Sequence, residues 1–155
     1  MSSMKMKSFS AGVLVLAVAC VIPAHAQNHC SDGTLIGKYG SVFNGQILIG
    51  PLAGLVNGIT LETFDGYGHF TSIDHVVLNG VQPAAEWRES SGTYTVNPDC
   101  TGKKVVTFLN NQPPPRITYF VITNSGKQLN TVGGNDGVAL SGVYTRSSDR
   151  DHDND

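Results

Sequence analysis

Histidine and carboxylate side chains are the groups in this sequence that could support acid–base or metal chemistry. His69 and His75 belong to one expected strand and lie six residues apart, which places them on one face but about 20 Å from each other. Asp74 points to the opposite face of that strand. Because the ligands of a metal ion must converge within a few ångströms of it, His69 and His75 cannot hold the same ion.

Sequence motifs of the common catalytic mechanisms are missing from the chain. It has no GxSxG nucleophile elbow, no GxxxxGK phosphate loop, no HExxH and no CxxC pair. The carboxylates that could form acid–base pairs are expected at strand ends and on solvent-facing positions; they are Glu62, Asp65, Asp74, Glu86 and Glu89. We therefore assign no catalytic residue, and the sequence favours a non-catalytic role.

The first 26 residues have the pattern of a secretory signal peptide. Lys5 and Lys7 precede an apolar run over residues 11–22, and Ala24-His25-Ala26 supplies the small-x-small cleavage site. The apolar run is short for a bilayer span, and an uncleaved anchor or a buried helix is the alternative. The pattern predicts a signal peptide over 1–26 and a secreted or periplasmic protein.

Cleavage after Ala26 would create a new N-terminus with the sequence Gln27-Asn28-His29. A free amine, two deprotonated amides and a histidine at the third position can enclose Cu(II) or Ni(II) in the square-planar nitrogen geometry that these ions prefer. Cyclisation of Gln27 would remove the amine and abolish the site. Apart from this metal motif, no cofactor is expected.

Two cysteines, Cys30 and Cys100, follow the signal peptide. An even number of cysteines in an exported chain indicates a disulfide, and two cysteines allow one intramolecular pairing. Free thiols or a metal pair are the alternatives, but the two residues lie far apart in sequence and have no CxxC context. We expect a Cys30–Cys100 disulfide.

Composition restricts the partners and the domain organisation. The 155 residues carry a formal net charge of −2, with 14% charged residues and 40% hydrophobic residues. No basic excess is present to displace counterions from phosphates, so nucleic acid is not an expected partner. No second apolar run is long enough to span a membrane after signal cleavage. We expect one domain over 27–146, and a disordered acidic tail over 147–155.

The segment after Gln27 has the pattern of strands and tight turns. Asn-Gly and Asp-Gly pairs supply the positive φ angles of hairpins, and β-branched or aromatic residues fill the intervals. The expected strands are Leu35–Phe43, Gln46–Ile49, Ile59–Phe64, His69–Leu78, Ala85–Val96, Lys104–Asn110, Ile117–Thr123, Gln128–Val132 and Val138–Arg146. This pattern predicts an all-β antiparallel meander of about eight strands in a closed or nearly closed barrel, with a β-sandwich as the alternative.

Two segments carry a resemblance to known proteins. Residues 62–71 (ETFDGYGHFT) and 92–102 (GTYTVNPDCTG), with a Gly37-Lys38-Tyr39 strand after Cys30, resemble a pattern in small exported bacterial proteins of unknown function. The resemblance covers most of residues 30–146. It implies a small barrel of the calycin or allene-oxide-cyclase-like type with its two cysteines joined, and it transfers no catalytic residue.

Two classes of function fit a barrel of this size. A barrel of about eight strands either packs its interior or holds one small ligand, which favours binding of a small apolar ligand. Interaction with an envelope protein through the outer surface is the second candidate. A barrel enzyme of isomerase or cyclase type is the alternative, because folds of this kind host both binders and enzymes. A cavity with convergent polar groups would favour ligand binding, and a filled barrel with an exposed apolar patch would favour interaction.

Overall fold

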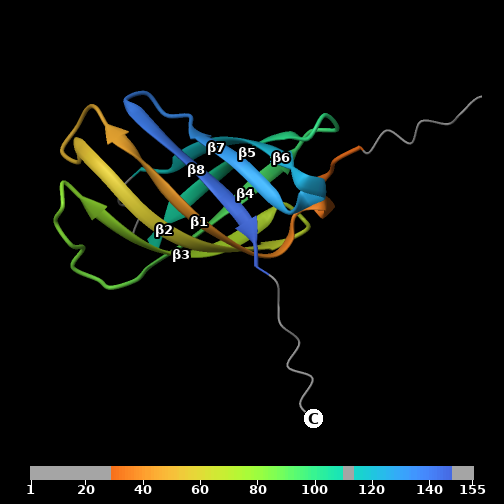
Figure 1. Cartoon of the computed structure of the whole chain (residues 1–155), viewed down its shortest axis with the longest axis horizontal. Helices are drawn as coiled ribbons and strands as arrows, with labels where there is room; N and C mark the ends of the chain where they lie inside the picture. The colour runs from red at the N-terminus through yellow and green to blue at the C-terminus, as the bar shows by residue number, and fades with distance from the viewer. Residues whose placement is uncertain (1–28, 110–113, 148–155) are drawn as a thin grey trace, which may run out of the picture.

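The computed structural model describes residues 29–109 and 114–147, where eight antiparallel strands close into a barrel (Figure 1). Each strand pairs with its sequence neighbour, and β8 pairs with β1 to close the sheet. The strands are β1 (Ile36–Ile47), β2 (Gly54–Asp65), β3 (His69–Leu78), β4 (Arg88–Val96), β5 (Thr101–Phe108), β6 (Arg116–Thr123), β7 (Gln128–Gly133) and β8 (Val138–Arg146). The predicted closed meander is confirmed, and the sandwich alternative is wrong.

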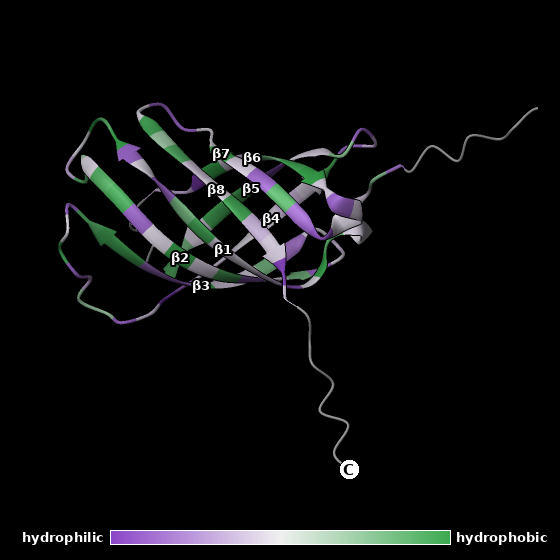
Figure 2. Cartoon of the chain, in the orientation of Figure 1, coloured by the Kyte–Doolittle hydropathy of each residue, from purple (hydrophilic) through white to green (hydrophobic). Residues whose placement is uncertain are grey.

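The two ends of the barrel differ in their connections. At the end that we call the closed end, short turns join β2 to β3, β4 to β5 and β6 to β7 (Figure 1, right). The 3-10 turn η3 (Asn124–Gly126) forms the β6–β7 connection, and η1 (Asp32–Thr34) lies at the same end. At the open end, the segments 48–53, 79–87 and 134–137 connect the strands. The last residues of β3, which lead to this end, are hydrophobic (Figure 2). This difference decides where a ligand could enter.

Aromatic side chains fill the closed end. Phe64 makes edge contacts with Tyr39 and Tyr94, with ring centroids 5.3 and 5.1 Å apart. Tyr94 donates to the carbonyl oxygens of Asp32 and Leu35, so the barrel wall holds η1 across this end. The buried cluster comprises Leu35, Tyr39, Phe64, Phe70, Tyr94, Phe120, Ile122, Leu129 and Tyr144. Burial of these rings is the main hydrophobic stabilisation of the fold.

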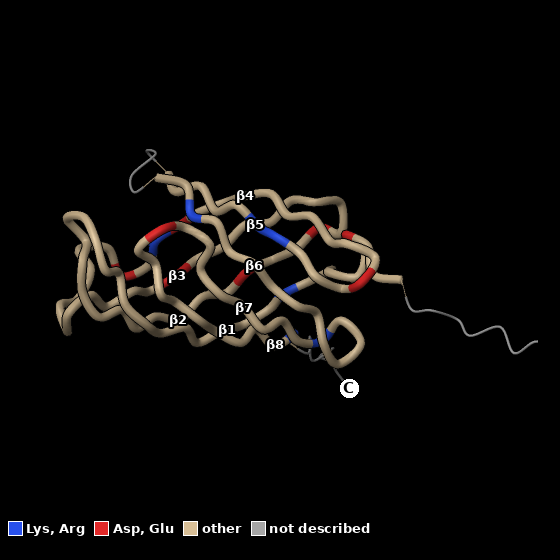
Figure 3. The backbone as a smooth tube through the Cα atoms, turned by 90° about the horizontal axis from the view of Figure 1, so that it is seen from above, with Lys and Arg blue, Asp and Glu red and all other residues tan. Residues whose placement is uncertain are grey.

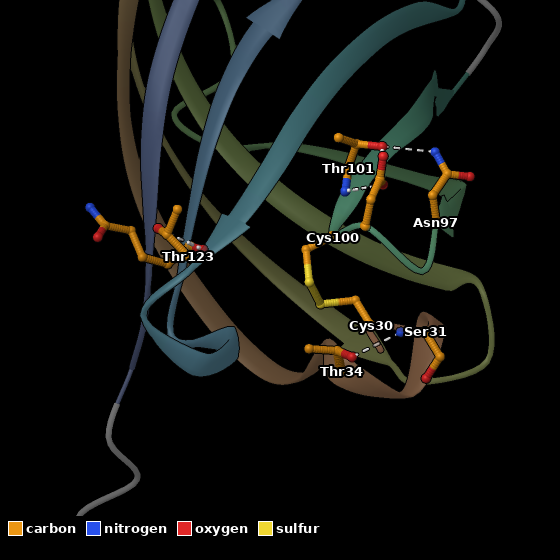
Figure 4. The surroundings of a disulfide bond; sticks show 9 residues. Cys30, Ser31, Thr34, Asn97, Cys100, Thr101 and Thr123 are labelled. Carbon is orange, nitrogen blue, oxygen red and sulfur yellow. Dashed lines mark hydrogen bonds between the residues drawn. A yellow bond between two sulfur atoms is a disulfide. The ribbon is translucent and has the colours of Figure 1, made fainter. Parts of the chain in front are cut away.

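A disulfide joins Cys30 to Cys100 at the closed end, as the sequence predicts (Figure 4). The two Cα atoms lie 5.0 Å apart, within the usual range for a bridge. Cys100 has a positive φ of 68° and donates its backbone N–H to the Asn97 carbonyl oxygen, which completes the β4–β5 turn. The bridge therefore anchors the start of the described chain to this turn.

The first two expected strands form one strand, β1, so the prediction of a break at Asn44-Gly45 is wrong. Gly45 continues the pairing with both neighbours, Val56 on β2 and Leu140 on β8. Its φ is 145°, and a Cβ there would collide with the backbone at Ala139. The glycine serves a close approach of two strands, which looks like a turn in sequence. Strand β2 begins at Gly54, five residues before the expected start at Ile59, because Gly54–Gly58 pairs with β1.

Strand β4 begins at Arg88, three residues later than expected. His75 Nδ1 donates to the Glu86 carbonyl oxygen, and its Nε2 lies 3.0 Å from Gln82 Oε1; these contacts hold the segment before β4 as a loop. The inward face of β6 carries Arg116 in line with Phe120 and Ile122, whereas Tyr119 and Val121 on its other face are exposed. The predicted signal peptide and residues 148–155 of the predicted tail lie outside the described residues.

Candidate functional site

Polar side chains occupy the middle of the barrel, between the aromatic cluster and the open end. They alternate with outward-facing residues along each strand, as the pleat requires. The buried polar and charged residues are Ser41, Thr60, Glu62, Ser72, Asp74, Ser90 and Lys104. Several of them line one cavity inside the barrel, so this polar layer is the candidate site.

A buried ion pair spans the interior between β2 and β5. Lys104 Nζ donates to both carboxylate oxygens of Glu62 at 2.6 Å, and the two residues are 1% and 3% exposed. Tyr144 Oη from β8 donates to Glu62 Oε1 at 3.1 Å, and the Lys104 ammonium lies 4.0 Å from the centre of the Tyr144 ring. These three hydrogen bonds engage both oxygens of the carboxylate.

Burial governs the protonation behaviour of this triad. Desolvation lowers the pKa of Lys104, and the negative charge and hydrogen bonds of Glu62 oppose that shift. Desolvation, followed by the Glu62 charge, raises the pKa of Tyr144 well above its usual value. Tyr144 therefore remains a neutral donor, and the triad acts as a fixed cross-brace of the barrel.

A second ion pair lies nearer to the open end. Asp74 and Arg88 face each other in the β3–β4 register, and Arg88 donates from Nε and from an Nη atom to the two carboxylate oxygens at 2.9 and 2.8 Å. The guanidinium also lies 4.3 Å from the centre of the Phe108 ring. This two-pronged geometry is the strong form of a carboxylate–guanidinium pair, and it orients Arg88 along the wall.

Arg116 is the third cation of the interior. It projects inward from β6 and is half-buried, with its guanidinium 5.8 Å from the Phe108 ring. Within residues 29–109 and 114–147, no carboxylate lies within ion-pair distance of Arg116 and it makes no side-chain hydrogen bond. Desolvation, and then the charge of Arg88, lower the pKa of Arg116, while Asp74 acts in the opposite direction. Arg116 thus has donors available to a ligand.

A small internal cavity connects these groups. It measures about 60 Å³, room for a few water molecules. Glu62, Asp74, Lys104 and Arg116 line its polar side, and the apolar side is formed by Phe43, Val106, Phe108 and Leu140. The interior is therefore neither a fully packed core nor a wide empty channel.

Two larger hollows lie at the open end, and both include the two arginines. One, of about 750 Å³, extends between the 48–53 loop and Pro114-Pro115. The other, of about 560 Å³, extends along Val76 and Leu78 to the 79–87 loop. Four residues belong to both hollows: Ile47, Leu52, Arg88 and Arg116. Together the hollows form one funnel, with mostly apolar walls and the two arginines at its base; the carboxylates Asp74 and Asp136 also belong to its lining.

Most residues singled out in the sequence lie elsewhere. His69 is exposed at the closed end beside Asp65, and His75 faces outward near the open end. Glu89 also faces outward. His29 is exposed, whereas Gln27 and Asn28 of the expected copper or nickel motif lie outside the described residues. Of the carboxylates considered in the sequence, Glu62 and Asp74 enter the interior, each already paired with a cation.

The sequence reasoning missed the three interior cations. A signal was present, because Lys104 alternates with Gly102, Val106 and Phe108, and Arg116 alternates with Phe120 and Ile122. A charged residue in phase with an apolar face is a candidate for the interior of a barrel. Which strands face each other across the barrel could not be read from that alternation.

The charged positions are few along the barrel and lie on strands as well as loops (Figure 3). No group of three or more His, Cys, Asp or Glu side chains gathers at metal-binding distance in the described part of the chain. The helical turns in that part include none long and apolar enough to cross a membrane. In comparisons with known proteins, the chain matches no family model, no curated protein and no solved structure.

Proposed function

We propose that this chain is an exported, non-catalytic barrel that binds one small ligand at its open end. The observation that carries the proposal is the funnel, whose two hollows share Ile47, Leu52, Arg88 and Arg116; Arg116 also lines the polar cavity. Concave sites with mostly apolar walls and a few convergent polar groups are the usual form of small-molecule sites. The available volume suits a compact molecule rather than a peptide.

The side chains around the funnel support binding over catalysis. Glu62 and Asp74 are held in bidentate ion pairs, and no histidine of the described strands faces the interior. A general base must have an oxygen or nitrogen available to take a proton from the ligand. An isomerase or cyclase that uses one of these carboxylates would first have to break its ion pair, so an enzyme remains the alternative proposal.

Export is part of the same proposal. The Cys30–Cys100 bridge is typical of an oxidising compartment, and the basic and apolar pattern of residues 1–26 is typical of a signal peptide. The resemblance to small exported bacterial barrels points in the same direction. Capture of Cu(II) or Ni(II) by Gln27-Asn28-His29 depends on cleavage after Ala26, and a visible absorption band on adding Cu(II) near neutral pH would test it.

An envelope interaction is the second candidate, and the outer surface favours it. Val42 pairs with Ile59 on one side and with Val143 on the other, and all three side chains are exposed. Trp87 and Ile73 border the same shallow depression, which has no charged residue among its lining. An uncharged apolar face of this kind is suited to contact with another protein.

Native intact-mass spectrometry tests the choice between the two. The protein would be exported to a bacterial periplasm and purified without detergent or chelator, then measured under native and denaturing conditions. We expect a mass shift of a small molecule that is lost on denaturation. A bare chain with the disulfide, unchanged after incubation with an extract of small molecules, would contradict the ligand proposal and favour the outer face.

A further inference from the structure

The charges of the barrel interior do not balance. Among the described strands, the inward-facing acidic and basic side chains are Glu62, Asp74, Arg88, Lys104 and Arg116. Lys104 is compensated by Glu62 and Arg88 by Asp74, each through two hydrogen bonds. Among these described side chains, Arg116 is left as one positive charge without an ion-pair partner at the base of the funnel.

Arg116 is half-buried, so its guanidinium has lost part of its hydration without gaining an ion-pair partner among the described residues, and its unpartnered nitrogens still reach the funnel. Asp74 acts on Arg116 through space, but both of its oxygens accept from Arg88. Arg88 adds a second positive charge next to Arg116. Asp136 also lines one of the two hollows, but it is exposed on the 134–137 loop and forms no ion pair with either arginine. The two guanidinium groups and the one inward-facing carboxylate therefore leave a site that attracts a single negative charge.

The surroundings define the rest of the ligand. The guanidinium of Arg116 faces the cavity whose apolar side includes Phe43, Phe108 and Leu140. Outward from it, the funnel walls are formed by aliphatic side chains such as Ile47, Leu52 and Val138. An anion without an apolar body would leave these walls in contact with water, and a neutral apolar molecule would leave Arg116 without a partner.

We propose that the ligand is a compact organic monoanion, whose anionic group accepts hydrogen bonds from Arg116 while its apolar body lies against the funnel walls. The planar fork of a guanidinium matches the paired oxygens of a carboxylate or sulfonate. This inference rests on the proposed ligand-binding function and specifies the chemical class of the ligand. It also assigns Arg116 as the residue that selects the charge.

The test compares two dyes that share one aromatic skeleton. 8-Anilinonaphthalene-1-sulfonate is a monoanion, and N-phenyl-1-naphthylamine is its uncharged counterpart; both fluoresce in apolar sites. We expect the wild-type protein to bind the sulfonate at least about tenfold more tightly, because hydrogen bonds to charged groups are worth that much or more. Arg116→Gln should weaken sulfonate binding by about 10- to 100-fold and change binding of the uncharged dye less than about twofold.

Lys103→Gln is the matched control. Lys103 faces outward on the neighbouring strand β5, and its replacement lowers the net charge by the same amount as Arg116→Gln does. This control should leave both affinities unchanged. Equal affinity for the two dyes, or equal effects of Arg116→Gln and Lys103→Gln, would overturn the assignment of a monoanion while leaving ligand binding intact. Absence of binding by both dyes would overturn the proposed function as well.

A second variant protects the test against a folding failure. Arg116→Lys keeps the charge and removes the fork, so sulfonate affinity should fall several-fold, less than in the glutamine variant. Thermal melts followed by circular dichroism would verify that each variant is folded. A folded Arg116→Lys variant that binds both dyes as the wild type does would contradict a role for the guanidinium fork.

Discussion

Lys104 and Glu62 meet inside the barrel although they come from strands that are not neighbours in the sheet. The ammonium group donates to both carboxylate oxygens at 2.6 Å, and the residues are 42 positions apart in sequence. Strands β2 and β5 have two other strands between them, so the pair ties opposite walls together. Tyr144 adds a third wall through its hydrogen bond to Glu62. The polar layer therefore stabilises the barrel by joining three of its strands, and it also forms the base of the candidate site.

Removal of one partner of this pair should destabilise the protein strongly. Lys104→Met leaves the Glu62 carboxylate buried without its cation, and we expect the free energy of unfolding to fall by about 3–5 kcal/mol. Urea denaturation followed by fluorescence would measure the change.

The double variant Lys104→Met with Glu62→Leu is the control for this prediction. It removes both charges and should recover part of the loss, since an apolar pair can replace a buried ion pair at little cost. The recovery is incomplete because the Tyr144 hydroxyl loses its acceptor. A single variant as stable as the wild type would show that Glu62 finds another partner or becomes protonated without penalty.

The disulfide should contribute substantially to stability. Its two cysteines are 70 residues apart, and closing a loop of that length stabilises the folded state by about 4 kcal/mol in the chain-entropy treatment. We expect a reducing agent to lower the urea midpoint of the wild type. The variant with both Cys30 and Cys100 replaced by serine should start at that lower midpoint and not respond to reductant; a response in this variant would point to a different target of the reagent.

The loop before β4 should be stabilised at acidic pH through His75. Hydrogen bonds to the Glu86 carbonyl oxygen and then to Gln82 raise the pKa of His75, and the charges of Glu86 and Asp74 add to this. Since the folded pKa is above the unfolded value of about 6.5, the contribution is complete below that value and is lost as the pH rises through the folded pKa.

Urea midpoints of the wild type and of His75→Gln, measured across that range, would test this prediction. The wild type should be the more stable protein at about pH 5.5, and the difference should shrink as the pH rises. Gln82→Ala should remove part of the same dependence, because it deletes one of the two partners of the ring. A difference that grows with pH would mean that the neutral imidazole is the better-bound form.

The sequence predicted the meander and its closure well, for reasons visible in particular strands. The boundaries of His69–Leu78 and Val138–Arg146 are confirmed, because Gly68 and Asn79-Gly80 flank the first and Gly137 precedes the second. The predicted break at Asn44-Gly45 is wrong. In the sequence, a glycine that allows two strands to approach closely cannot be told from a glycine in a turn.

The candidate site was much less predictable than the strands. The Asp74–Arg88 pair follows from the register of one hairpin and could be inferred once β4 was known to start at Arg88. The Lys104–Glu62 pair and the position of Arg116 depend on how the closed sheet curls, which places side chains from distant strands together. Alternation in a single strand contains no information about that curvature.

Asp74 should oppose anion binding. Its removal should therefore raise the affinity for the sulfonate dye, whereas Arg116→Gln should lower it. Asp74→Asn removes the carboxylate that compensates Arg88 and acts on Arg116 through space, so both guanidinium groups become available. We expect sulfonate-dye affinity to rise several-fold, while stability falls by about 1 kcal/mol because the pair is partly solvent-exposed. Glu89→Gln, an outward-facing change of the same net charge on β4, should leave both quantities unchanged. Asp74→Asn could instead lower the affinity for the sulfonate dye, as Arg116→Gln should. That result would show that anion binding depends on the position in which Asp74 holds Arg88, and not on the excess positive charge.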